Sequence, residues 1–382
     1  MISRAQLATS LMRLWQQRSW RSRALLPLAW LYGALLLMRR ALYALGWLRQ
    51  TRLPVPVIVV GNIFVGGTGK TPLVVWLVEQ LRAHGWHPGV IARGYGARID
   101  HVVEVHQASD PMTVGDEPLL IKHRTGAPVA VSRRRVAAAQ QLLRAHPEID
   151  VVIADDGLQH YALARTIEIQ LSDTRGHGNG WLLPAGPLRE PASRRADFFV
   201  VNSAVKVLSP AVVVDQSSST SLNQSTAFSS TSAVSTSNTS ALSAVSTRGT
   251  TISHYPMQLH AEFAERLAQR ADRLALADLP KEKRIMAAAG IGHPQRFFDM
   301  LRGFGIDLAD TIALPDHFDY QSNPFQRVDA DIILITEKDA VKCERTPQLA
   351  NDARLWVVPV TARIAGPLID NLLEILRGRA PA

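Results

Sequence analysis

The first 78 residues of this 382-residue chain contain no aspartate or glutamate; Glu79 is the first acidic residue. The same stretch is rich in tryptophan and tyrosine and carries the arginines Arg4, Arg13, Arg18, Arg21, Arg23, Arg39, Arg40, Arg49 and Arg52. The whole chain has a formal net charge of +9, which favours anionic partners. Because the basic residues gather in an apolar, tryptophan-rich segment, a lipid surface is favoured over nucleic acid.

The chain also has only one cysteine and no long hydrophobic run in its N-terminal segment. Cys343 is the single cysteine, so no internal disulfide can form, and a reducing compartment is favoured. The uncharged apolar segment 24–38 is shorter than the roughly 20 residues that span a bilayer, and no clear cleavage site follows it. We expect residues 1–52 to form basic amphipathic helices at a membrane surface. Docking on the protein's own core and a true span are the alternatives.

The remaining composition, 47% hydrophobic and 20% charged, is typical of a globular protein. A β-branched run at 55–60, a glycine-rich stretch at 61–69 and an apolar-periodic helix to about residue 83 predict the opening of a parallel α/β unit. Strands and helices then alternate, which predicts a doubly wound core over residues 53–208. We expect strands at 90–92, 129–131, 151–154, 167–171 and 198–201, and helices at 117–123 and 133–145.

Serine and threonine dominate residues 209–251, which we interpret as a low-complexity insertion or linker. Regular patterns return near residue 254. Strand patterns at 284–289, 332–335 and 355–358 alternate with helical patterns at 294–302 and 366–376. We therefore expect a smaller C-terminal α/β part over residues 252–382.

The glycine-rich stretch ends in Gly66, Gly67, Thr68, Gly69, Lys70 and Thr71, the end of a Walker A loop. Glycines allow backbone N–H groups to face phosphate oxygens. In this pattern Lys70 would reach the β- and γ-phosphates of ATP, and Thr71 would bind Mg²⁺. Phe64 stands where the simple pattern has its first glycine.

Two acids, Asp155 and Asp156, follow the apolar strand 151–154. An acid in this place helps to hold Mg²⁺ in Walker A proteins, although adjacent aspartates can also cap a turn. Other polar positions stay open from spacing alone. Asp116 is favoured as a helix cap over a general base, His317 is a loop histidine or an acid–base group, and Arg189 lies in an exposed loop or stabilises phosphoryl charge.

Several motifs in order resemble the tetraacyldisaccharide 4′-kinase family of the lipid A pathway. They are Val60-Gly61-Asn62, Gly66 to Pro72, Ala92-Arg93-Gly94-Tyr95-Gly96, Gly115-Asp116-Glu117-Pro118, Asp155 to His160, Leu183 to Pro191, Pro315-Asp316-His317-Phe318 and Thr336-Glu337-Lys338-Asp339-Ala340. The family also lacks glycine at the position of Phe64. The insertion 209–251 is a departure from it.

The resemblance implies a P-loop NTPase-like fold, with an N-terminal segment held peripherally or monotopically at the cytoplasmic face of the bacterial inner membrane. It implies Mg²⁺-dependent transfer of the γ-phosphate of ATP to the 4′-hydroxyl of a lipid-linked disaccharide, tetraacyldisaccharide 1-phosphate, giving lipid IVA. Alternatives are a P-loop switch GTPase and a membrane-associated ATPase partner without a lipid acceptor.

The resemblance also assigns residue roles. Lys70 and Thr71 match the phosphate and Mg²⁺ residues, and Asp155 and Asp156 match the second acidic motif. Asp116 matches the family's proposed base, with His317 as its partner, which reverses the preference for a cap. Arg189 and Glu190 match a loop near ATP, and Arg93 and Gln159 match motif positions with less defined roles.

Overall fold

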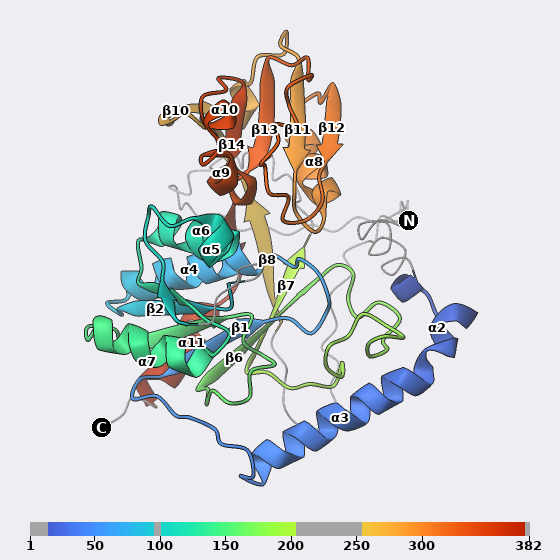
Figure 1. Cartoon of the computed structure of the whole chain (residues 1–382), viewed down its shortest axis with the longest axis vertical. Coiled ribbons are helices and arrows are strands. Elements are labelled where there is room, and N and C mark those ends of the chain that lie inside the picture. Colours follow the sequence, from blue (N-terminus) through green and yellow to red (C-terminus); the bar gives the residue numbers. More distant parts are fainter. Residues whose placement is uncertain (1–13, 95–100, 204–253, 379–382) are drawn as a thin grey trace, which may run out of the picture.

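The computed structural model describes residues 14–94, 101–203 and 254–378. Two β-sheets, each with its own helices, are arranged along the long axis, and the smaller sheet lies above the larger one in Figure 1. The expected insertion at 209–251 and residues 1–13 of the N-terminal segment lie outside the described residues.

The larger sheet has the strand order β15-β8-β7-β6-β1-β5-β2-β4-β3. Neighbouring strands from β8 to β4 are parallel, and the edge strands β15 and β3 are antiparallel to their neighbours. A mixed α/β fold with a large parallel sheet is thus confirmed. The strands are β1 (Val57–Gly61), β2 (Pro88–Ala92), β3 (Val103–Glu104), β4 (Val129–Val131), β5 (Val151–Asp155), β6 (Ile167–Asp173), β7 (Phe198–Ser203), β8 (His254–His260) and β15 (Thr361–Ile364).

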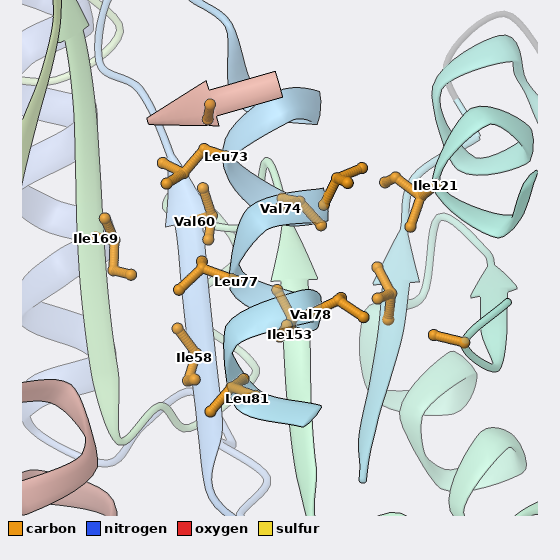
Figure 2. Packing of buried hydrophobic residues seen from close by; sticks show 14 of the residues in the cluster. Ile58, Val60, Leu73, Val74, Leu77, Val78, Leu81, Ile121, Ile153 and Ile169 are labelled. Atoms are coloured by element: carbon orange, nitrogen blue, oxygen red, sulfur yellow. The ribbon is translucent and has the colours of Figure 1, made fainter. Parts of the chain in front are cut away.

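Helices pack on both faces of this sheet because its parallel strands are buried on both sides. On one face, Leu73, Leu77 and Leu81 recur every four residues along one side of a helix and pack over Ile58 and Val60 (Figure 2). The opposite face forms a second core. The helices around this sheet are α4 (Lys70–Ala83), α5 (Pro111–Val114), α6 (Asp116–Thr125), α7 (Arg135–Ala145) and α11 (Leu368–Gly378).

The smaller sheet has the order β10-β9-β14-β13-β11-β12. Its four strands from β14 to β12 are parallel, and β9 and β10 form an antiparallel edge. Its elements are β9 (Phe263–Arg266), β10 (Gln269–Ala275), η1 (Leu276–Asp278), β11 (Ile285–Ala289), α8 (Pro294–Gly303), β12 (Asp310–Ala313), β13 (Ile332–Thr336), α9 (Glu337–Cys343), α10 (Pro347–Ala350) and β14 (Leu355–Val358). Two further cores cover its faces.

The sequence predicts one C-terminal α/β part over residues 252–382, but the structure divides these residues between the two sheets. Strand β8 extends the larger sheet beside β7, β15 pairs with β8, and α11 returns to the larger core. The leucines of α11 are the reason, since Leu368, Leu372 and Leu376 are fully buried there. We call residues 261–360 the smaller lobe and the rest of the described chain the larger lobe.

The N-terminal segment forms α2 (Trp20–Ala24) and α3 (Leu26–Ala44), and α3 runs along the outside of the larger lobe (Figure 1). Its outward side is apolar, with exposed Trp20, Leu28, Trp30, Leu31, Leu35, Leu37, Met38, Leu45 and Trp47 along the segment. No helix in the described part of the chain is long and apolar enough to cross a membrane.

Candidate active site

The glycine-rich loop between β1 and α4 is held in one conformation by two asparagines. Asn62 Nδ2 donates to Gly66 O at 3.2 Å and Thr68 Oγ1 at 3.1 Å, and Asn202 Nδ2 donates to Thr68 O at 2.9 Å. Gly69 has a φ of +94°, and a Cβ there would lie 2.7 Å from Asn202 Nδ2. Glycine is therefore required at this position, both for the backbone conformation and for the space. The loop delivers Lys70 as the first residue of α4.

The acidic pair lies at the end of β5, the strand beside β1. Asp156 has a φ of +49°, a strained conformation that is common at functional positions. Its two carboxylate oxygens lie 3.6 Å from Lys70 Nζ and 3.3 Å from Arg189 Nη1. Arg135 Nη2 donates to the backbone carbonyls of Asp155 at 2.8 Å and Asp156 at 3.1 Å, and these bonds stabilise the turn that carries the two acids.

Electrostatics separate the two acids. Burial, reinforced by the charge of Glu117, raises the pKa of Asp155 to about 7. Burial also disfavours the charged form of Asp156, but Lys70 and Arg189 outweigh it and hold the pKa of Asp156 below its usual range. Oδ1 of Asp155 and Oδ1 of Asp156 are buried and accept no hydrogen bond from any described residue. Buried oxygens of this kind are suited to a cation.

Asp116 and His317 meet across the two lobes, although 201 residues separate them. His317 Nδ1 lies 2.9 Å from Asp116 Oδ2, and Asp116 Oδ1 accepts the backbone N–H of Glu117 at 2.9 Å. The helix-cap interpretation of Asp116 is therefore wrong, because Gly115 is the N-cap of α6 and Asp116 is the first residue of the helix, where its side chain faces His317. Burial works against its charge, but the His317 hydrogen bond and the lysines Lys338 and Lys342 hold the pKa of Asp116 well below its usual range.

Both lysines come from α9; Lys338 has no role in the sequence analysis beyond its place in a family motif, and Lys342 is not named there. Lys342 Nζ lies 2.8 Å from Asp116 Oδ2. Lys338 Nζ lies 3.2 Å from both Glu117 Oε1 and Asp316 Oδ1, and 3.4 Å from His317 Nε2. One sequence pattern could have indicated them. Lys338 and Lys342 are four residues apart just after the strand that ends at Thr336, and this spacing places both on one face of a short helix.

The loop that carries Arg189 is fixed by the N-terminal helices. Tyr32 Oη of α3 donates to Arg189 O at 2.9 Å, and Trp15 Nε1 donates to Pro184 O at 2.9 Å. Glu190 is 1% exposed and forms an ion pair with Arg194. A nucleotide contact of Glu190 therefore stays a prediction.

A second contact between the lobes lies beside the glycine-rich loop, and sequence reasoning did not anticipate it. Arg175 Nη2 donates to Gly67 O at 3.0 Å, and its Nη1 lies 2.7 Å from His293 Nε2 of the smaller lobe. A Cβ on Gly292 would lie 3.4 Å from Gly67 N and 3.3 Å from Asp316 Oδ2. The loop before α8 therefore packs against the glycine-rich loop. It also lies beside Asp316, the residue that precedes His317 in the sequence.

The structure thus places most of the predicted site residues at one junction. The glycine-rich loop, Asp155, Asp156 and Arg189 belong to the larger lobe, and Asp116 of that lobe faces His317 of the smaller lobe. Gln159 Nε2 donates to Asn62 O at 3.3 Å, so it supports the loop from the acidic side. The carboxyl ends of β1, β5, β11 and β13 all lead into this junction, as is usual for ligand sites in parallel sheets.

Comparisons with known proteins agree with this arrangement. A model of the tetraacyldisaccharide-1-P 4′-kinase family matches residues 21–377. The tetraacyldisaccharide 4′-kinase of Janthinobacterium sp. (strain Marseille) is 49% identical over 100% of this chain and 99% of its own length. That of Herminiimonas arsenicoxydans is 47% identical, with the same coverage. A crystal structure described as the "apo" form of LpxK from Aquifex aeolicus in complex with ATP aligns with a TM-score of 0.68 and 26% identity, covering 94% of this chain and 98% of the other.

Proposed function

Since this chain belongs to the tetraacyldisaccharide-1-P 4′-kinase family, we propose how its two lobes divide the family's reaction between them. The enzyme is a kinase of lipid A biosynthesis that transfers the γ-phosphoryl group of ATP to the 4′-hydroxyl of tetraacyldisaccharide 1-phosphate. One observation carries the assignment of roles: the larger lobe supplies a glycine-rich loop with Lys70, and the smaller lobe brings His317 onto Asp116 beside it.

ATP would bind at the glycine-rich loop, which acts as a P-loop. Backbone N–H groups of residues 66–71 would face the phosphates, and Lys70 would leave Asp156 to contact the β- and γ-phosphates. Arg189 also forms an ion pair with the Asp156 carboxylate, and its guanidinium would turn to contact the transferred phosphoryl group. Both cations act where negative charge develops, which is the main catalytic requirement of phosphoryl transfer.

Mg²⁺ fits the acidic pair. The buried Oδ1 atoms of Asp155 and Asp156, which accept no hydrogen bond from any described residue, would together with the hydroxyl of Thr71 supply the hard oxygen ligands that Mg²⁺ prefers. Phosphate oxygens and water would complete its coordination. Bound there, Mg²⁺ supplies charge neutralisation for the phosphates.

We assign proton acceptance to His317. Both oxygens of Asp116 are already engaged, one by a backbone N–H and the other by His317 and Lys342, and the carboxylate is 3% exposed. Asp116 therefore has no oxygen free to meet a hydroxyl. With Nδ1–H donated to Asp116, His317 Nε2 carries the lone pair that would take the proton of the 4′-hydroxyl once the substrate displaces Lys338 Nζ, which lies 3.4 Å from it. The alkoxide then attacks the γ-phosphorus, the β–γ bond breaks, and ADP leaves.

The lipid substrate would reach this site from the membrane surface. The exposed apolar side of α2 and α3, with Trp20 of α2 75% and Trp30 of α3 69% exposed, would lie in the interface, and the arginines would meet lipid phosphates. We place this surface on the cytoplasmic face of the inner membrane, where ATP is available, with the protein peripheral or monotopic.

A transfer assay tests these roles. Purified protein, Mg²⁺ and γ-labelled ATP are mixed with detergent-solubilised tetraacyldisaccharide 1-phosphate. We expect label in the lipid, and a loss of at least about 100-fold in His317→Ala, the lower end of the range typical of general base catalysis. His84→Ala, an exposed histidine after α4, is the matched control. Full activity of His317→Ala would refute its role, and ADP release without labelled lipid would favour an ATPase without a lipid acceptor.

A further inference from the structure

The carboxylate of Asp116 has a counter-ion that the proposed mechanism does not use. Lys342 Nζ lies 2.8 Å from Asp116 Oδ2, the same oxygen that faces His317 Nδ1 at 2.9 Å. The two side chains are 5% and 3% exposed, so water does not screen the pair. Lys342 Nζ makes no hydrogen bond with any described residue, so its effect on Asp116 is electrostatic.

Lys342 belongs to helix α9, and a second buried acid of this helix, Asp339, attaches the helix to the loop after β11. Both oxygens of Asp339 accept the backbone N–H of Gly290, at 3.1 and 3.0 Å, and Oδ2 also accepts the Thr336 hydroxyl at 2.6 Å. Gly290 O in turn accepts the backbone N–H of His317 at 3.2 Å. One hydrogen-bonded unit of the smaller lobe therefore carries His317 and Lys342, the two groups that meet Asp116.

We propose that Lys342 is a positioning residue of the kinase, which acts through Asp116 to hold the Asp116–His317 pair aligned and to set its proton affinity. This inference rests on the proposed function. Lys342 does not itself touch substrate. Its fixed charge compensates the carboxylate, so that His317 keeps the orientation of a base without being locked as a strongly stabilised imidazolium.

Lys338 differs from Lys342 in its surroundings. It lies among Glu117, Asp316 and His317, and its side chain is 15% exposed at the lobe junction. Among the residues that the structure describes, the charged groups recorded against the Asp116–His317 pair include these two acids and the two lysines. Removing Lys342 leaves the pair with one positive charge fewer, which favours protonation of the pair. The acidic limb of the pH–kcat profile must therefore move to higher pH.

The test compares Lys342→Met, Lys342→Arg and the control Lys122→Met in the transfer assay across pH. Lys122 is a lysine of α6 that donates to Ala127 O at 3.1 Å, far from Asp116 along the helix. We expect Lys342→Met to lower kcat at least about tenfold with the KM for ATP little changed, since only alignment for the chemical step is lost. Its acidic limb should move to higher pH. Lys342→Arg should restore part of kcat and keep the wild-type limb, and Lys122→Met should match the wild type.

A double-mutant cycle covers the case in which Lys342→Met fails to fold because Asp116 is left unpaired. Asp116→Asn removes that charge, so Asp116→Asn/Lys342→Met should fold and show the same kcat as Asp116→Asn alone. An unshifted acidic limb, an arginine variant no better than methionine, or additive losses in the cycle would each overturn the proposal. Absent wild-type transfer would overturn the proposed function as well, whereas normal wild-type transfer with an unaffected Lys342→Met would overturn this inference alone.

Discussion

Tyr32→Phe tests whether the N-terminal helix positions the catalytic loop. The Tyr32 hydroxyl donates to Arg189 O at 2.9 Å, and Arg189 N donates to Ile63 O at 2.7 Å at the start of the glycine-rich loop. Arg189 Nη1 then reaches Asp156 at 3.3 Å. Removing one oxygen atom from Tyr32 leaves its ring in place and releases one of the two backbone bonds that fix Arg189.

The expected size follows from that single bond. A buried neutral hydrogen bond contributes a net of about 0.5–1.5 kcal/mol, and 1 kcal/mol corresponds to a factor of about five in an equilibrium. If this energy keeps Arg189 in its catalytic position, kcat should fall by about twofold to tenfold, while the melting temperature changes by only a few degrees. The effect should be seen with both short-chain and membrane-bound acceptors, because the bond lies inside the protein.

The assay is lipid phosphorylation in mixed micelles, with kcat and KM measured for each substrate. Tyr43→Phe is the matched control, since Tyr43 also lies on α3 and contacts Tyr161 through its ring, at 5.8 Å between centroids. Wild-type kcat in Tyr32→Phe, or an equal loss in Tyr43→Phe, would refute the idea that α3 positions Arg189.

Three further outcomes are expected. Lys70→Ala should lower kcat by at least about 100-fold, because one phosphate-binding charge is lost, while urea unfolding stays near that of the wild type, because Asp156 keeps Arg189 as a counter-ion. Leu77→Ala should reduce the free energy of unfolding by roughly 2–5 kcal/mol, because Leu77 is fully buried between α4 and the larger sheet. The pKa of Asp116 is lowered in the folded state, so its charge stabilises the fold above the usual aspartate pKa and this stabilisation is lost as the pH falls. The difference in urea midpoint between the wild type and Asp116→Asn should therefore narrow below about pH 4.

Many helices and strands could be predicted because short stretches of the sequence show the apolar periodicity of the element that they form. The β-branched runs at 129–131 and 151–154 are β4 and β5, and the apolar periodicity to residue 83 is α4. The boundary predicted at residue 252 does not separate the two sheets. Strand β8 and helix α11 have patterns that suit either sheet, and only the available partners, β7 and the larger core, decided where they pack.

The candidate site divides in the same way. Lys70, Asp155 and Asp156 follow strands whose neighbours are set by the order of a parallel α/β unit, so their proximity could be inferred. The resemblance to the kinase family paired Asp116 with His317, but spacing alone favoured a helix cap. Nothing in the sequence indicated that Lys342 shares the same carboxylate oxygen.

The sequence by itself therefore determined the glycine-rich loop, the acidic strand end, the basic apolar N-terminus and the family motifs, because each is a short run of neighbouring residues. The tertiary structure alone decided that Tyr32 of α3 bonds the loop of Arg189, and that Asp116 lies between His317 and Lys342 of α9. These contacts join residues more than 150 positions apart, and their strength depends on burial, which no spacing along the chain encodes.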